Sequence, residues 1–130
     1  MNRIDLQELS KIRLKEARAL LRPGLSDGAY YLAGYSVERA IKAVIAKKTN
    51  HGDFPDKKRA DASYTHSLKD LIIVADLETP RRDRALADSE FKDNWDAVKL
   101  WSEQSRYQRY DPVAAQQLIR AVGERRHGVI

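Results

Sequence analysis

The sequence predicts an all-α fold: an up-and-down helical bundle of four to five helices, in one domain over residues 1–130. Apolar residues recur at the three- and four-residue spacing of a helix, and no segment alternates with period two for long enough to be a strand. Glycine and proline are scarce, at six and four residues, while Ala, Leu, Arg, Lys and Glu abound. A chain of 130 residues suffices for one hydrophobic core.

The first helix is predicted to start near Asp5 and to stop at Pro23-Gly24, because proline cannot continue the hydrogen-bond ladder and glycine suits the cap. Asp5 and Glu8 have capping-box spacing. The expected apolar stripe consists of Leu9, Ile12, Ala17 and Leu20.

The second helix has the clearest pattern and is predicted to be the central helix of the bundle. Ser26 or Asp27 can cap it, and it extends to about Lys48. Its small residues allow a neighbouring helix to approach closely. The expected stripe is Tyr30, Ala33, Gly34, Val37, Ala40, Ile41, Val44 and Ile45.

The rest of the chain predicts one loop and two or three more helices. Residues 49–64 are expected to form an exposed loop, followed by a helix over about residues 65–77 capped by Ser67. A fourth segment follows Thr79-Pro80 and covers about residues 81–102, either continuous or broken near Asp93-Asn94. Asp111-Pro112 then starts a last helix that ends near residue 122. The expected apolar positions are Leu68, Leu71, Ile72, Ala75, Leu86, Phe91, Trp95, Val98, Trp101, Val113, Leu118, Ile119 and Val122.

Composition narrows the class of protein. The absence of cysteine excludes a disulfide framework, thiol catalysis and thiolate metal sites. The longest nearly uncharged stretch, residues 29–36, is too short to span a membrane, and the N-terminus has no apolar signal core. We therefore expect a soluble, cytoplasmic protein. There is no Gly-rich phosphate loop, and the three histidines lack metal-ligand spacing, so no metal or cofactor is predicted.

A formal net charge of +5 leaves two interpretations of the basic clusters: a solvated surface or a face that binds a polyanion. The segment 105–110 alternates arginine with aromatic residues, as phosphate pairing and base stacking require. Its candidate RNA- or nucleotide-binding residues are Arg106, Tyr107, Arg109 and Tyr110. Alternatively, the tyrosines pack on the bundle and the arginines only reach solvent.

Glu38 and Arg39 on the second helix pose a similar choice. Glu38 lies four residues before Lys42, which is the spacing of an ordinary surface ion pair. It also lies beside the small-residue face of the helix, where a charge is costly unless it is paired. We therefore include Glu38 and Arg39 among the candidate binding residues. Tyr30, Tyr31 and Tyr35 are expected to be core or interface aromatics.

Four stretches together resemble the HEPN domain family. They are Arg13–Ala17, Gly28–Ala43 with its sequence GAYYLAGYSVERAIKA, Tyr64–Leu68 and Trp101–Tyr107, so the resemblance covers nearly the whole chain. It implies a helical bundle that usually forms a homodimer and is often encoded beside a nucleotidyltransferase partner in toxin–antitoxin pairs. Many relatives are metal-independent RNases with an R-x4-6-H motif near the start of the last long helix.

The chain departs from that motif. Segment 105–110 has arginines but no histidine, and the two formal matches, Arg59 with His66 and Arg120 with His127, lie elsewhere. We therefore expect a HEPN-like bundle that binds RNA, a nucleotide or a nucleotidyltransferase-type partner without the usual RNase centre. A first alternative is an RNase toxin that uses Arg106 or Arg109 with another proton carrier, such as Tyr107 or His66. A second is a purely structural or interaction bundle.

Overall fold

The computed structural model describes residues 2–49, 62 and 64–130, and every regular element among them is helical. The α-helices are α1 (Arg3–Leu21), α2 (Ser26–Thr49), α4 (Leu68–Val74), α5 (Glu78–Ala87), α6 (Ser89–Val98) and α7 (Pro112–Gly123), and a 3-10 helix, η1, covers Glu103–Tyr107. The prediction of an all-helical fold is confirmed. The described residues hold six α-helices rather than four to five.

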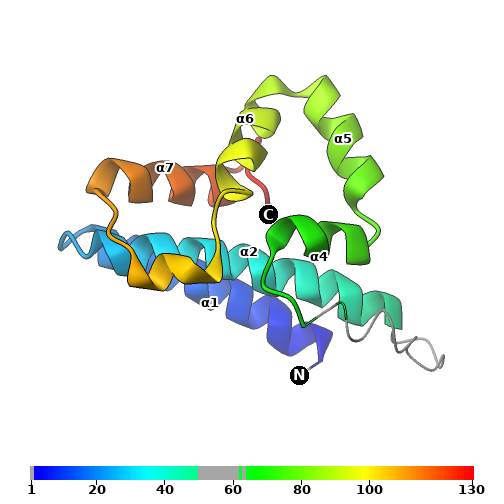
Figure 1. Cartoon of the computed structure of the whole chain (residues 1–130), viewed down its shortest axis with the longest axis horizontal. Helices are drawn as coiled ribbons and strands as arrows, with labels where there is room; N and C mark the ends of the chain where they lie inside the picture. Colours follow the sequence, from blue (N-terminus) through cyan, green and yellow to red (C-terminus); the bar gives the residue numbers. More distant parts are fainter. Residues whose placement is uncertain (1, 50–61, 63) are drawn as a thin grey trace.

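Helices α1 and α2 form an antiparallel pair that is the base of the molecule (Figure 1). Helix α1 starts two residues earlier than predicted, because Asn2 rather than Asp5 is its N-cap and Asp5, the third residue of the helix, completes the capping box. The pair is joined by a tight turn in which Gly24 has a positive φ of 85°. Buried Ser10 and Ser36 each donate a hydrogen bond from the hydroxyl to the other's carbonyl, both at 2.8 Å, which ties the two helices together.

The chain between α2 and η1 differs most from the prediction. Helix α4 is shorter than expected, although Ser67 caps it as predicted. The fourth segment is two helices that meet at Asp88, not one helix or a break near Asp93-Asn94. The Asp88 side chain accepts hydrogen bonds from the N–H groups of Glu90 and Phe91 and so starts α6. Leu77, not Thr79, is the N-cap residue of α5.

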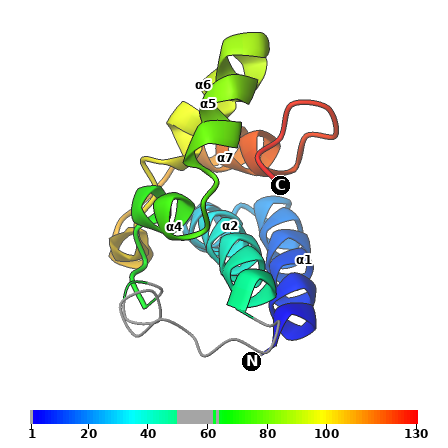
Figure 2. The ribbon, with the colours of Figure 1, turned by 90° about the vertical axis from the view of Figure 1, so that its right-hand side faces the viewer.

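Helices α5 and α6 form a V that rises above α4 and α7 (Figures 1 and 2). Helix α5 has no buried residue, so it stands outside the core. Helix α7 lies across α2 and α6, and it starts at Asp111-Pro112 as predicted. Asp111 accepts a hydrogen bond from the Ala114 N–H at 2.7 Å.

The core lies between the α1–α2 pair and the helices above it. Most expected apolar positions are buried there, among them Val37, Leu71, Trp95 and Leu118. Ile12, Leu86 and Val113 were wrongly expected to be apolar contacts: all three are exposed, Leu86 by 89%. In α1 the buried positions are Leu6, Ser10, Leu14 and Ala17, so the stripe lies partly on a different face from the predicted one.

Part of the sequence prediction lies outside the described residues. This applies to most of the expected loop over 49–64, to Arg59 and to the side chain of Arg106. No helix within residues 2–49, 62 and 64–130 combines the length and apolarity needed to cross a bilayer.

Candidate functional site

The segment that contains η1 lies antiparallel on α2, and this contact positions most of the candidate residues. Its first anchor is Trp101, which is buried against Gly34. A Cβ at Gly34 would overlap the indole ring, so only glycine lets the ring approach so closely. The indole ring also lies 5.9 Å from the Tyr31 ring, between centroids.

At one end of this segment, a histidine joins three elements. His66, just before α4, places Nδ1 2.5 Å from Oε1 of Glu38 on α2. Its Nε2 lies 3.3 Å from Oε2 of Glu103 on η1. Glu38 is fully buried, and Lys42 Nζ lies 3.9 Å from its Oε1. Glu38 is therefore not part of a surface ion pair. It is a buried carboxylate that depends on His66 and Lys42 for compensation.

In this histidine cluster each nitrogen of the His66 ring has a different carboxylate partner. The contact with Glu38 fixes the orientation of the imidazole through Nδ1, whereas the side chain as a whole remains 43% exposed. A carboxylate on one ring nitrogen orients the imidazole, as in general acid–base histidines, but here the second nitrogen, Nε2, also lies beside a carboxylate, that of Glu103. The same contacts also serve a structural purpose, since they fasten α4 and η1 to α2. Oε2 of Glu38 and the hydroxyl of buried Ser105 have no hydrogen-bond partner among the described residues.

Arg39 faces a different neighbourhood from Glu38. Its guanidinium lies over the Tyr35 ring, 4.5 Å from the centroid, and donates a hydrogen bond to the Tyr35 hydroxyl. Burial, with the nearby charge of Arg13, holds the pKa of Arg39 below its usual value. Arg39 thus belongs to an aromatic–cation contact beside α1, outside the histidine cluster.

The other end of the segment is anchored at the start of α2. The Tyr110 ring stacks on the Tyr30 ring with centroids 3.6 Å apart, and the Tyr110 N–H donates to Oδ1 of Asp27 at 2.5 Å. Burial and the neighbouring Tyr110 raise the pKa of Tyr30, and burial raises the pKa of Tyr110. One face of Tyr110 is therefore covered within the protein and is not available for stacking on a base.

A small pocket of about 370 Å³ opens beside this anchor. It is lined by the first residues of α2, including Ser26, and by Arg109 and Tyr110. Ser26 is only 5% exposed and its hydroxyl has no hydrogen-bond partner among the described residues. The residue before the helix is Leu25, whose side chain cannot accept a hydrogen bond from the first free N–H groups of α2. Arg109 is exposed and forms no ion pair with any described residue.

The structure thus divides the predicted site residues into two groups along α2. Glu38 and His66 lie at one end, and Arg109 and Tyr110 at the other. From Asp27 to Glu38 the helix rises about 16 Å, so Arg109 does not act together with His66 in one protomer. Tyr107 lies between them on η1 and is 72% exposed.

A second histidine cluster has no counterpart in the prediction beyond the formal pair of Arg120 with His127. His127 places Nδ1 2.7 Å from Asp88 and Nε2 3.2 Å from Glu90. The hydrogen bond with Asp88 raises the pKa of His127 above its usual range. Its partners are therefore the carboxylates around the start of α6, not Arg120. Only the tertiary structure brings residues 88 and 127 together.

Comparisons with family models, curated proteins and solved structures found no match to this chain. Among the residues that the structure describes, no three or more His, Cys, Asp or Glu side chains are arranged to hold a metal ion. The two residue groups along α2 are therefore the features of the chain that indicate a function.

Proposed function

We propose that the chain is a HEPN-like helical domain that binds RNA or a nucleotide, with the phosphate held in the pocket at the start of α2. The observation that carries the proposal is the meeting of Arg109, the buried hydroxyl of Ser26 and the N-terminus of α2 at one pocket. Free N–H groups at a helix start attract anions, and an arginine beside them adds a charge-assisted hydrogen bond.

The tethering of the segment supports the same proposal. Residues 103–110 are fixed at both ends, by Glu103 on His66 and by Tyr110 on Tyr30. Between these anchors Tyr107 is exposed. A segment that is already ordered loses less conformational entropy when it binds a ligand.

Asp27 opposes an anion at this pocket, since its carboxylate lies in the first turn of α2. Its Oδ1 already accepts a hydrogen bond from the N–H of Tyr110. Replacement by asparagine keeps the acceptor and removes the charge. Asp27→Asn is therefore expected to tighten binding, whereas the loss of Arg109 weakens it.

A second candidate function is metal-independent RNA cleavage, as in the RNase members of the HEPN family. The specific observation in its favour is the contact between His66 Nδ1 and buried Glu38, which orients the imidazole. Nε2 would be the proton-transfer atom, and for that it would have to exchange its contact with Glu103 for one with the RNA. Arg106, on the same 3-10 helix as Glu103, would stabilise charge on the phosphate. The homodimer, the nucleotidyltransferase-type partner and a toxin–antitoxin role follow from the resemblance alone and remain part of this proposal.

The test is RNA binding by fluorescence anisotropy, measured over a series of salt concentrations with single-stranded RNA as the probe. Arg109→Ala is expected to weaken binding and to lower the slope of log K against log salt by about one. Arg125→Ala is the matched control, because Arg125 is exposed outside this pocket. Equal effects of the two variants would reject the pocket as the binding site.

The same protein is incubated with labelled RNA in a chelator to test cleavage. Cleavage that is lost in His66→Ala and in Arg106→Ala would establish the RNase alternative. Binding without cleavage would leave a non-catalytic member. A protein that neither binds nor cleaves RNA, and binds no nucleotide, would disprove the proposed function.

A further inference from the structure

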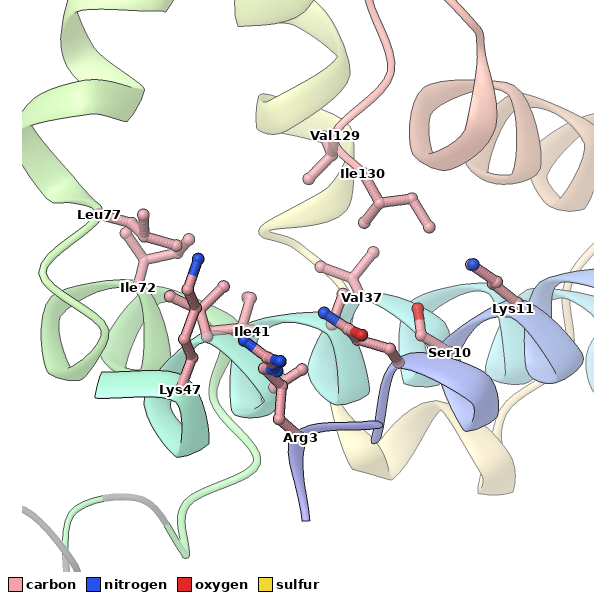
Figure 3. Close-up of a pocket in the computed structure, with 14 residues that line it drawn as sticks. Arg3, Ser10, Lys11, Val37, Ile41, Lys47, Ile72, Leu77, Val129 and Ile130 are labelled. Atoms are coloured by element: carbon pink, nitrogen blue, oxygen red, sulfur yellow. The ribbon is translucent and has the colours of Figure 1, made fainter. Parts of the chain in front are cut away.

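A groove of about 700 Å³ lies away from both groups of candidate residues. Its volume is in the range of small-molecule sites, about 300–1,000 Å³. Figure 3 shows its base on α2, bordered by α1, by the junction of α4 and α5 and by the segment after α7. The labelled apolar side chains are Val37, Ile41, Ile72, Leu77, Val129 and Ile130.

The border of the groove formed by the segment after α7 is held in place by backbone hydrogen bonds. The N–H of Val129 donates to the carbonyl of Ala121 at 3.0 Å, and that of Ile130 to the carbonyl of Val122 at 3.1 Å. His127, held between Asp88 and Glu90, fastens the chain just before them. This border therefore has a fixed position over α2.

The charged side chains that line the groove all have one sign. Arg3, Lys11 and Lys47 line it, and none of the described residues that line it is acidic. Lys11 and Lys47 lie at opposite ends of the groove, and Arg3 lies between them on the α1 side (Figure 3). None of the three forms an ion pair with a described residue. Their charges are therefore available to a ligand.

We propose that this groove binds an amphiphilic anion, of the kind represented by a medium-chain carboxylate. Burial of the alkyl chain against the apolar side chains of the groove supplies the affinity, because the removal of apolar surface from water stabilises the complex. A terminal carboxylate pairs with Lys11 or Lys47 at the rim, where the positive field favours an anion and disfavours a cation. An anion without a chain gains only the weak exposed ion pair.

The experiment is calorimetric titration of the full chain with decanoate below its micelle concentration, with acetate and decyltrimethylammonium as comparison probes. We expect saturable binding of decanoate and none of the other two. The double variant Lys11→Gln/Lys47→Gln is expected to bind decanoate about fivefold more weakly. Lys15→Gln/Lys69→Gln, which removes the same charge from exposed sites on α1 and α4 outside the groove, is expected to bind like the original protein.

Ala40→Phe tests the chain-binding part of the groove, since Ala40 lines it and is only partly buried. It is expected to abolish decanoate binding without a change in helix content by circular dichroism. Absence of decanoate binding, equal binding of the cationic probe, or equal effects of the two lysine pairs would overturn the proposal. Sedimentation tests whether a second copy of the chain fills the groove instead. If the protein is a dimer and Ala40→Phe dissociates it, the groove is a contact between two copies and the proposal is overturned.

Discussion

His66 and His127 are each held between two carboxylates, but the carboxylates differ in burial. Glu38, the closer partner of His66, is fully buried on the central helix, whereas the two partners of His127 keep contact with water: the side chain of Asp88 is 24% exposed and that of Glu90 71%. In the first cluster the imidazole compensates a charge that has left water. In the second, carboxylates that water already solvates attract an imidazolium. The two clusters use the same side-chain types, but the partner that needs stabilising differs. In the first, the buried carboxylate of Glu38 needs its histidine; in the second, the charged form of His127 is stabilised by its carboxylates.

The largest effect is expected from Glu38→Ala. The change removes the partner of both His66 and Lys42, leaves a cavity in α2, and releases α4 and η1 from the central helix. We expect a loss of about 3 kcal/mol in the free energy of unfolding, because the new cavity and the mostly buried Lys42, now without this carboxylate, both destabilise the fold. Urea denaturation measures it. A loss no larger than that of Glu90→Gln would show that burial does not distinguish the two clusters.

Gly34→Ala tests the other attachment of η1 to α2. The new methyl group overlaps the buried Trp101 ring, so we expect a loss of about 2 kcal/mol despite the better helix propensity of alanine. Gly28→Ala on the same helix is the control, because its Cβ would lie 3.2 Å from the flexible end of Leu20. Tryptophan fluorescence should shift in the first variant and not in the second.

The stability that the His127 cluster contributes should be lost both at high pH and at low pH. The pKa of His127 is raised by Asp88, so its stabilising contribution is full below about 6.5 and is lost as pH rises through the raised pKa. The pKa of Asp88 is lowered by the same hydrogen bond, so its contribution is lost as pH falls below about 3.8. Thermal unfolding across this range measures both limits. His127→Gln should remove the loss at the upper limit; a persistent loss there would assign it to another group.

The smallest effect is expected from Glu90→Gln. The side chain is mostly in water and its contact with His127 at 3.2 Å is the outer of the two. Exposed pairs contribute little to stability, so the melting temperature should barely change. Asp88→Asn is the matched comparison, since Asp88 also caps α6. A larger effect at Glu90 than at Asp88 would contradict the assignment of Asp88 as the main partner of His127.

Local signals in the sequence predicted the helices well. Asp111-Pro112, Ser67 and the regular stripe of α2 act over one or two turns, so the sequence alone indicates them. The break at Asp88 is not evident because residues 81–102 carry helical spacing throughout, and Asp88 is one of four aspartates there that could cap a helix. The start of α1 was misplaced because two capping-box pairs overlap, and Asn2 with Asp5 forms the real one.

The candidate site was predictable only in part. The cost of a charge on the small-residue face indicated that Glu38 needs a partner, yet that partner, His66, lies 28 residues away and no periodicity connects them. Arg109 and Tyr110 were named for their types, but the pocket that they line depends on the docking of their segment at the start of α2. Sequence spacing describes one element at a time, whereas a site is formed between elements.

The α1–α2 pair has a consequence for how the chain folds. Its two helices are joined by a short turn, and the hydrogen bonds of Ser10 with Ser36 join residues 26 positions apart. Contacts at a smaller separation in sequence need less loop closure and form earlier. We expect this pair to be the folding nucleus and the 3-10 segment to dock last, because its attachments to α2 join residues about 70 to 80 positions apart.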